Sequence, residues 1–199
     1  MDLSGISHIV VIDTATKKLA ADFAIAGDFR FAQSDGNGHV YVSVGEAHRT
    51  WLENGRTVQN DFPRRIARLD GPAIAADIHR RLDAQSHTPS SSIEPVHIDW
   101  SHNADPGADF HFFPLRSNCA NPQGLAVDDK HLRLFLACDN QKLLVLNAGT
   151  GDPVASLTTG PGDDVLSYDQ DRGLVFVANS AGYGSLTIIR QAETLTPTK

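Results

Sequence analysis

A run of histidines and aspartates in the middle of the chain has the residue types that hold a transition metal. Its members are His97, Asp99, His102, Asp105, Asp109 and His111. Imidazole and carboxylate groups are common ligands of zinc, copper and iron. If residues 96–100 form a strand, however, His97 and Asp99 lie together on one face, opposite an apolar set. This alternation is equally typical of a strand that has one solvent-exposed face. The run therefore has two interpretations: a metal site built from His97, Asp99, His102 and His111, or a solvated strand surface.

A second set of acidic and amide residues is spread along the chain next to apolar stretches. Its members are Asp28, Glu46, Asn121, Asp139, Asn140, Asp163, Asp164 and Asn179. Carboxylate and amide oxygens bind hard cations such as Ca²⁺ and hydrogen-bond to hydroxyl-rich molecules. Asp and Asn are also the residues that tight turns favour. A ligand site requires that the fold bring these side chains to one place, whereas turn chemistry does not.

Several chemistries are disfavoured by what the sequence lacks. It has no Gly-x-Ser-x-Gly motif, no phosphate-binding glycine loop and no His-Glu-x-x-His motif. The formal net charge of -7 disfavours nucleic acid as a partner. No apolar stretch is long enough for a membrane helix, and the first residues lack the basic and apolar regions of a signal peptide. We therefore expect no membrane span and no cofactor other than a divalent cation.

The apolar stretches that must position the candidate residues recur along the chain. One unit is a branched or leucine-rich strand that ends in an acid or amide, as at residues 8–13 and 143–147. The second is an Asp, a short polar turn and an alternating apolar strand, which begins at Asp35, Asp128 and Asp169. The last two recur about 40 residues apart, which is the length of a four-stranded propeller blade. Helical patterns are nearly absent, so the repeat predicts β-blades.

The predicted fold is all-β, a partial β-propeller over residues 1–199 with about three four-stranded antiparallel blades and one helical insertion. The best-formed blade has strands at 124–127, 133–138, 142–146 and 154–158, and the next has three, at 164–168, 174–178 and 185–190. The strands at 8–12 and 19–25 are the third and fourth of an earlier blade, and another blade begins at Phe29. We expect an open arc in which Ile9, Val11 and Ile188 lie near uncovered ends, and self-association through the bare blade faces.

One blade is interrupted by an insertion that we place at residues 45–94. Within it, apolar residues at four-residue steps predict a short helix at about 72–84, with arginines at 64, 65, 68, 80 and 81 forming a solvated basic patch. The third strand of this blade is then residues 96–100. Residues 65–70 imitate the same repeat unit equally well, so the sequence leaves the choice between the two segments open.

Blade geometry brings the acidic and amide residues to one face. Connections between blades, and the turns between the second and third strands, lie together around the mouth of the axial channel. That face collects the whole acidic and amide set, and the insertion would overhang it. Loops on a rigid scaffold are where function concentrates, so the expected partner at this face is a small molecule or a protein.

The blade sequences resemble a known family. Residues 119–128, 134–140, 159–164 and 182–187 are similar to the bacterial YVTN-type, YncE-like seven-bladed propeller proteins, with a weaker likeness to NHL and gluconolactonase propellers. The likeness covers residues 109–191 well and 6–44 loosely. It implies a fragment of a larger, seven-bladed parent, a location in the bacterial periplasm or cell envelope, and a binding or scaffolding role. The alternative is a metal-dependent lactonase, for which Asn121 and Asp163 or Asp164 match part of the ligand set that the likeness implies.

The two cysteines lie at one rim of the best-formed blade. Counting outward from the turn at 128–131 places Cys138 opposite about Pro122, three positions from Cys119. A modest curl of the chain would bring the two Cα atoms within the roughly 4.4 to 6.8 Å that a disulfide requires. An envelope location favours the bond, whereas a cytosolic location favours two buried thiols.

Overall fold

The structure is a computed structural model that describes residues 5–86, 96–100, 110–115 and 118–192. The N-terminal half contains β1 (Ile6–Asp13), β2 (Lys18–Ala26), β3 (Asp28–Ser34), β4 (His39–Gly45), β5 (Ala47–Glu53), β6 (Arg56–Phe62), β7 (Arg65–Asp70) and α1 (Gly71–Ser86). The remainder contains β8 (Val96–Trp100), β9 (Phe110–Pro114), β10 (Pro122–Asp128), β11 (Arg133–Cys138), β12 (Lys142–Asn147), β13 (Pro153–Thr158), β14 (Asp163–Asp169), β15 (Leu174–Asn179) and β16 (Ser185–Arg190). The described chain is all-β apart from one helix.

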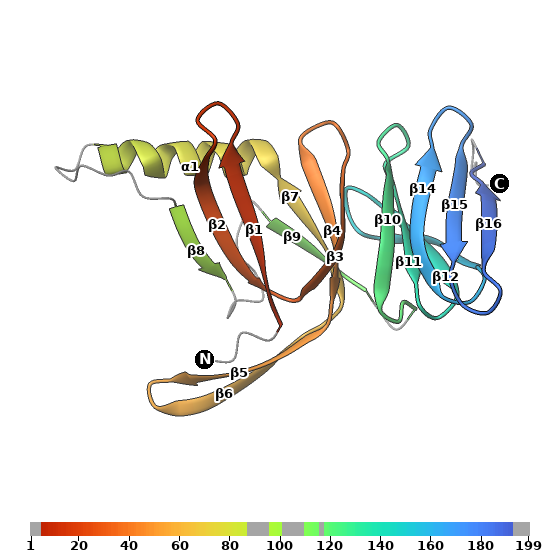
Figure 1. Ribbon diagram of the computed structural model, residues 1–199, viewed down its shortest axis with the longest axis horizontal. Helices are drawn as coiled ribbons and strands as arrows, with labels where there is room; N and C mark the ends of the chain where they lie inside the picture. Colours follow the sequence, from red (N-terminus) through yellow and green to blue (C-terminus); the bar gives the residue numbers. More distant parts are fainter. Residues whose placement is uncertain (1–4, 87–95, 101–109, 116–117, 193–199) are drawn as a thin grey trace, which may run out of the picture.

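Four sheets stand in a row, with the N-terminal strands at one end and the C-terminal strands at the other (Figure 1). We call them the first sheet (β1-β2-β8), the second sheet (β3-β4-β7-β9), the third sheet (β10-β11-β12-β13) and the fourth sheet (β14-β15-β16). The second, third and fourth sheets are antiparallel throughout. Strands β5 and β6 form a separate hairpin that projects from the row.

Apolar layers between neighbouring sheets form the core. The third sheet is buried on both faces, because Leu134 and Leu136 point toward the second sheet while Phe135 and Ala137 point toward the fourth. This accounts for its continuous apolar sequence, since a strand buried on both sides has no polar alternation. At Gly124 the third and fourth sheets come so close that an added Cβ would lie 2.7 Å from the backbone nitrogen of Leu166. Only glycine fits there.

The predicted helix is confirmed and extends over residues 71–86. Asp70 begins it, since its carboxylate accepts a hydrogen bond from the backbone nitrogen of Ala73 at 2.9 Å, as an N-cap does. Ile74 and Ile78 are buried in the layer between the first and second sheets, and Leu82 packs against the same layer. The four-residue spacing in the sequence is therefore the spacing of the face that packs.

The interpretation of residues 96–100 as the third strand of the interrupted blade is wrong. That strand is β7, the rival segment, which pairs antiparallel with β4 so that Val44 faces Arg65. Strand β8 instead runs parallel to β2 at the edge of the first sheet, with Phe23 opposite Ile98. The region 45–94 is thus not a single loop with a helix, because its described part contributes a hairpin and a full strand of the second sheet. The propeller repeat predicted no parallel pair.

The expected uncovered ends are present in part. Ile188 is exposed on β16. Ile9 and Val11, in contrast, pack inward against the layer between the first and second sheets, and their neighbours Val10 and Ile12 are exposed. The alternation of β1 is therefore the reverse of what we expected, because its apolar face, beside Phe23 and Ile25 of the neighbouring β2, packs against the second sheet.

Candidate functional site

The acidic and amide candidates lie along one edge of the row of sheets. This edge is where β3, β10 and β14 begin and where β4, β11 and β15 end, since Asp28 pairs with Gly45, Pro122 with Cys138 and Asp163 with Asn179. We call it the disulfide rim, and it comprises Asp28, Glu46, Cys119, Asn121, Cys138, Asp139, Asn140, Asp163, Asp164 and Asn179. The β5–β6 hairpin leaves the second sheet at the same edge, as expected of the insertion, but α1 lies at the opposite edge (Figure 1).

A disulfide joins Cys119 to Cys138 at the centre of this rim, with the two Cα atoms 5.2 Å apart. The predicted proximity is confirmed, and so is the predicted register, because Cys138 pairs with Pro122. Both cysteines are fully buried. The bond ties the segment before β10 to the end of β11, so the loop cannot move away from the strand that it precedes.

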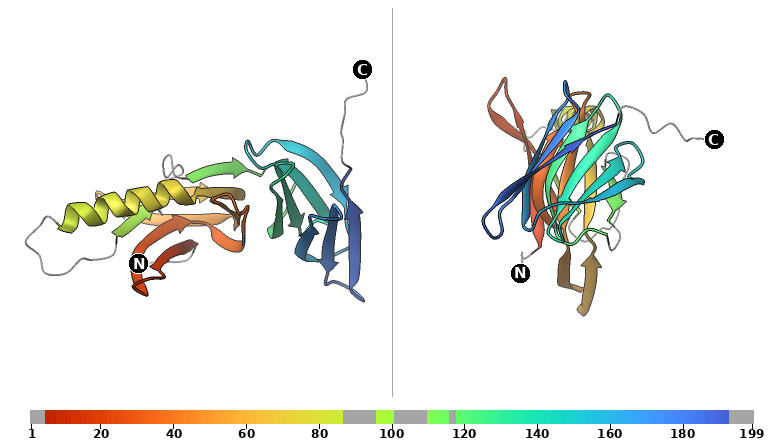
Figure 2. Two further views of the ribbon diagram at one scale, coloured as in Figure 1. Left: turned by 90° about the horizontal axis from the view of Figure 1, so that it is seen from above. Right: turned by 90° about the vertical axis from the view of Figure 1, so that its right-hand side faces the viewer.

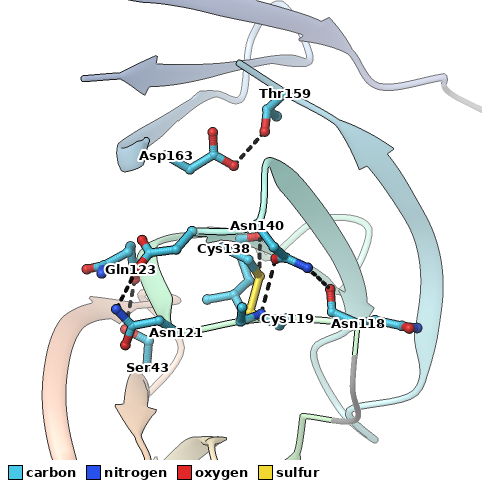
Figure 3. Close-up of a disulfide and its surroundings, with 12 residues drawn as sticks. Ser43, Asn118, Cys119, Asn121, Gln123, Cys138, Asn140, Thr159 and Asp163 are labelled. Carbon is cyan, nitrogen blue, oxygen red and sulfur yellow. Dashed lines mark hydrogen bonds between the residues drawn. A yellow bond between two sulfur atoms is a disulfide. The ribbon is translucent and has the colours of Figure 1, made fainter. Parts of the chain in front are cut away.

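Around the disulfide, amide side chains hold the loop in place (Figure 3). The Asn140 carbonyl oxygen accepts a hydrogen bond from the backbone nitrogen of Ala120 at 3.1 Å, and its amide nitrogen donates to the carbonyl oxygen of Asn118 at 3.3 Å. Asn121 has a φ of 48°, a left-handed conformation that Asn tolerates well. Its side chain donates to the Asp139 carboxylate at 2.5 Å. Asn140 and Asn121 therefore serve the turn, as the alternative interpretation of the sequence proposed.

Asp163 and Asn179 are buried cross-strand partners with incomplete hydrogen bonding. The Thr159 hydroxyl donates to one Asp163 carboxylate oxygen at 2.5 Å, and the Asn179 amide nitrogen donates to the hydroxyl oxygens of Ser185 and Thr187. The other carboxylate oxygen of Asp163 and the carbonyl oxygen of Asn179 have no partner among the described residues. Burial raises the pKa of Asp163, while the hydrogen bond from Thr159 opposes that rise.

The exposed carboxylates of the disulfide rim are Asp28, Glu46, Asp139 and Asp164. Asp28 forms an ion pair with Arg30 at 2.7 Å, and Glu46 lies 3.8 Å from Arg64. Asp139 and Asp164 have no ion pair with a lysine or arginine among the described side chains. Negative charge therefore exceeds positive charge along this set of named residues.

The candidate metal ligands are not brought together. His97 lies on β8 in the first sheet, 3.3 Å from the carboxylate of Asp22, whereas His111 lies on β9 in the second sheet, opposite Arg68. Asp99 is also on β8, and His102 lies outside the described residues. Within the part of the chain that the structure describes, no three histidine, cysteine, aspartate or glutamate side chains are placed to hold a metal ion. The two strands belong to different sheets, which separates residues that are close in sequence.

A cluster that the sequence analysis missed lies at the opposite edge, which we call the turn rim. The fully buried Asp128 accepts hydrogen bonds from His131, Tyr168 and Gln191 at 2.6, 3.0 and 2.8 Å. Burial acts to raise the pKa of Asp128, but the hydrogen bonds from His131 and Gln191 outweigh it and the pKa is lowered. Burial, together with the bond to Asp128, raises the pKa of Tyr168 to about 12. The sequence does contain a pattern that could have indicated this cluster. Each of the repeated aspartates at 35, 128 and 169 is followed three or four residues later by His or Arg.

The basic patch expected at the arginines of the insertion is only partly formed. Arg80 and Arg81 are exposed and pair with Asp77 on α1. Arg65 is buried instead: its guanidinium lies 3.9 Å from the ring centre of Phe112 and donates to the carbonyl oxygen of Ala26 at 2.6 Å. Burial lowers the pKa of Arg65 to about 10. Arg65 is buried because β7 lies between β4 and β9 in the second sheet.

Comparisons with known proteins show a likeness of structure but none of sequence. No protein-family model and no curated protein matches the sequence. The structure is similar to the solved structure of Kuenenia stuttgartiensis hydrazine synthase, with a TM-score of 0.60 and 15% sequence identity. The match covers 95% of this chain and 53% of that one, so the chain spans about half the length of the structure that it matches. At this identity the likeness concerns the fold alone. Among the described residues, no helix is long and apolar enough to cross a membrane.

Proposed function

We propose that this chain is part of a binding or scaffolding β-propeller of the YncE-like, YVTN type, with the disulfide rim as its binding face. The succession of three antiparallel sheets packed face to face supports the propeller. Each of the second and third sheets has four strands, as a blade has. The parent protein would contain seven such blades, of which this chain supplies about three.

The observation that carries the proposed binding face is the exposed carboxylates on a rigid edge. Asp139 follows a disulfide-tied strand end, and Asp164 follows the buried Asp163 at the start of β14. Because the backbone at these two positions is already held in place, binding a positively charged ligand there costs little main-chain entropy. A divalent cation is the simplest such ligand, and Ca²⁺ prefers oxygen donors.

The test is a thermal shift titration with calcium, and with manganese and zinc in parallel. A ligand that binds the folded state alone stabilises it by about 2.7 kcal/mol at one hundred times its dissociation constant, so the melting temperature should rise with calcium. The double variant Asp139→Asn/Asp164→Asn should abolish the rise. Asp171→Asn, which removes an exposed carboxylate at the turn rim, should keep it. Identical titrations for these variants, or no response of the parent chain to any of the three ions, would refute a cation site here.

The disulfide supports a location in the bacterial periplasm or cell envelope, because disulfides persist in oxidising compartments and are rare in the cytosol. Cell fractionation followed by thiol alkylation tests this part of the proposal. The Cys119 and Cys138 thiols should be unreactive in protein isolated under denaturing, alkylating conditions. Alkylation of both cysteines in freshly lysed cells would contradict it.

A further inference from the structure

A cavity lies between the third and fourth sheets, which pack face to face at the C-terminal end of the row (Figure 2). Its volume of about 280 Å³ is close to the lower limit for small-molecule sites. Its apolar walls include Leu143, Val145, Ala155 and Leu157 of the third sheet and Val175 and Ile189 of the fourth. Among the described residues that line it, two are arginines, one is a histidine and none is acidic. The cavity therefore has an apolar interior, and its ionisable groups are all basic.

The cavity exists because the third sheet has smaller side chains than the second sheet at equivalent positions. The cross-strand pairs of the two sheets align so that Arg68 and Phe113 of the second correspond to Val145 and Leu157 of the third. The Arg68 guanidinium lies 5.9 Å from the ring centre of Phe113 and donates across the interface to the carbonyl oxygen of Gly149 at 3.1 Å. Val145 is too short to span the corresponding distance. The space is thus set by side-chain size inside the sheet interface.

Arg133 is the arginine whose side chain faces this cavity. It shares the face of β11 that carries Phe135, toward the fourth sheet, whereas Arg190 alternates with the inward-pointing Ile189 on β16. The Nη1 atom of Arg133 donates to two main-chain carbonyl oxygens in the turn before β11, at 3.1 and 3.2 Å. Arg133 forms no ion pair with a carboxylate among the described side chains. Its guanidinium is therefore held in place and has donors left for an anion.

The turn-rim cluster closes the same end of the cavity. His131 and Gln191 line the cavity and both donate to Asp128. Asp128 is fully buried behind them and does not itself line the cavity. The negative charge nearest to Arg133 in this cluster is thus screened from the cavity by its own hydrogen-bond donors.

We propose that this cavity binds a small carboxylate with an apolar chain, with the carboxylate group on Arg133 and the chain between the third and fourth sheets. The planar fork of an arginine matches a carboxylate through paired, parallel hydrogen bonds. The chain is buried against Leu143, Val145 and Val175, and this burial supplies most of the affinity, because a partly exposed charge pair contributes little by itself. The site is at the turn rim, so it does not depend on a cation at the disulfide rim.

The first experiment is isothermal titration calorimetry of the purified chain with hexanoate, heptanoate and octanoate. Each added methylene should tighten binding about fourfold for as long as the cavity has room for it. Octylammonium has the same chain with the opposite charge, and it should bind at least about tenfold more weakly than octanoate. An absence of saturable octanoate binding would overturn the proposal. So would equal affinities for octanoate and octylammonium.

Variants of the charged group test where the carboxylate binds. Arg133→Gln should weaken octanoate binding at least about tenfold, because it removes a charge-assisted hydrogen bond. Arg133→Lys should lose less, because it keeps the charge and gives up only the fork geometry. Arg172→Gln removes an exposed arginine elsewhere on the turn rim, and should leave the affinity unchanged. Equal losses for Arg133→Gln and Arg172→Gln would show a general charge effect and overturn the assignment.

Variants of the apolar wall test where the chain binds. Ala155→Leu on the edge strand β13 fills part of the cavity and should weaken octanoate binding about tenfold. Ile188→Ser is the control, because Ile188 is 57% exposed on the side of the fourth sheet that faces away from the third. It should leave the affinity unchanged, and circular dichroism should show that both variants fold. Octanoate binding that Ile188→Ser abolishes and Ala155→Leu does not would place the ligand on that outer side and overturn the proposal.

Discussion

Two buried aspartates at opposite edges of the same sheets behave in opposite ways. At the turn rim, fully buried Asp128 accepts hydrogen bonds from three side chains and its pKa is lowered. At the disulfide rim, Asp163 is 2% exposed, accepts one side-chain hydrogen bond on one oxygen, and its pKa is raised. Burial penalises the charge of both groups. At Asp128 the side-chain hydrogen bonds outweigh burial and lower the pKa, whereas at Asp163 burial, helped by the negative charge of Asp139, outweighs the hydrogen bonds and raises the pKa.

The largest effect should come from removing the charged centre of the turn rim. Asp128→Ala leaves the partly buried donors of His131, Tyr168 and Gln191 without this acceptor, which should lower the free energy of unfolding by roughly 3 kcal/mol. Chemical denaturation at neutral pH measures the change. Asp169→Ala is the matched control, because Asp169 occupies the same position in the fourth sheet but its hydrogen bonds to Arg172 and that residue's backbone are exposed. Equal losses in the two variants would contradict the role given to the cluster.

Removing the covalent bond should be the next largest effect. The disulfide closes a loop between positions 19 apart, and a loop of that size contributes about 3 kcal/mol in the chain-entropy model, with smaller values common. The double variant Cys119→Ala/Cys138→Ala should unfold at lower denaturant concentration than the parent chain. Reductant should shift the parent chain toward the variant and leave the variant itself unchanged. A parent chain insensitive to reductant during unfolding would show that this bond does not hold the rim.

The smallest effect, and the one that separates the two aspartates most clearly, is their pH dependence. The folded-state pKa of Asp128 is lowered, so its stabilisation is complete above its unfolded pKa of about 3.9 and is lost as the pH falls through the folded value. The folded-state pKa of Asp163 is raised, so its stabilisation is complete below the unfolded pKa and is lost as the pH rises through the folded value.

Asp163→Asn should therefore leave the free energy of unfolding at pH 7 unchanged or raise it by up to about 1 kcal/mol, since it removes a charge that burial disfavours. Urea denaturation at a series of pH values from acid to neutral gives the profile. The advantage of the variant over the parent chain should shrink as the pH falls. Asp128→Asn should show the reverse, with a loss that is largest at neutral pH. Parallel profiles for the two variants would mean that the carboxylates do not differ.

The features that could be predicted from the sequence are those set by contacts between residues close together in the chain. The pairing of Cys138 with Pro122 follows by counting from a short turn, because the register of an antiparallel hairpin is fixed by its loop. The helix follows from the spacing of Ile74, Ile78 and Leu82 and from Asp70 before it. The positions of the disulfide-rim residues at strand ends follow from the repeat. All of these are determined within one hairpin or one helix.

What the sequence could not predict depends on contacts between distant segments. Strands β7 and β8 have equally good alternation, and the arginines of β7 suggested a surface. Arg65 is buried because aromatic rings of β6 and β9 stack on its guanidinium and a carbonyl of β2 accepts its hydrogen bond. The parallel pairing of β8 with β2 likewise joins residues far apart in the chain. The hydrogen bonds at Asp128 also depend on distant segments, since their donors Tyr168 and Gln191 lie 40 and 63 positions further along the chain.

The β5–β6 hairpin has a consequence for how this fold can be altered. Val44 and Arg65, the residues between which it is inserted, are already cross-strand partners, so the second sheet does not need the hairpin to hold its strands in register. Its base is fastened by buried Phe62 and Ala47, but residues 52–57 are exposed throughout. The turn at Asn54 and Gly55 is therefore a suitable insertion site. A foreign domain or a fluorescent reporter inserted there would lie beside the disulfide rim and outside the packed layers.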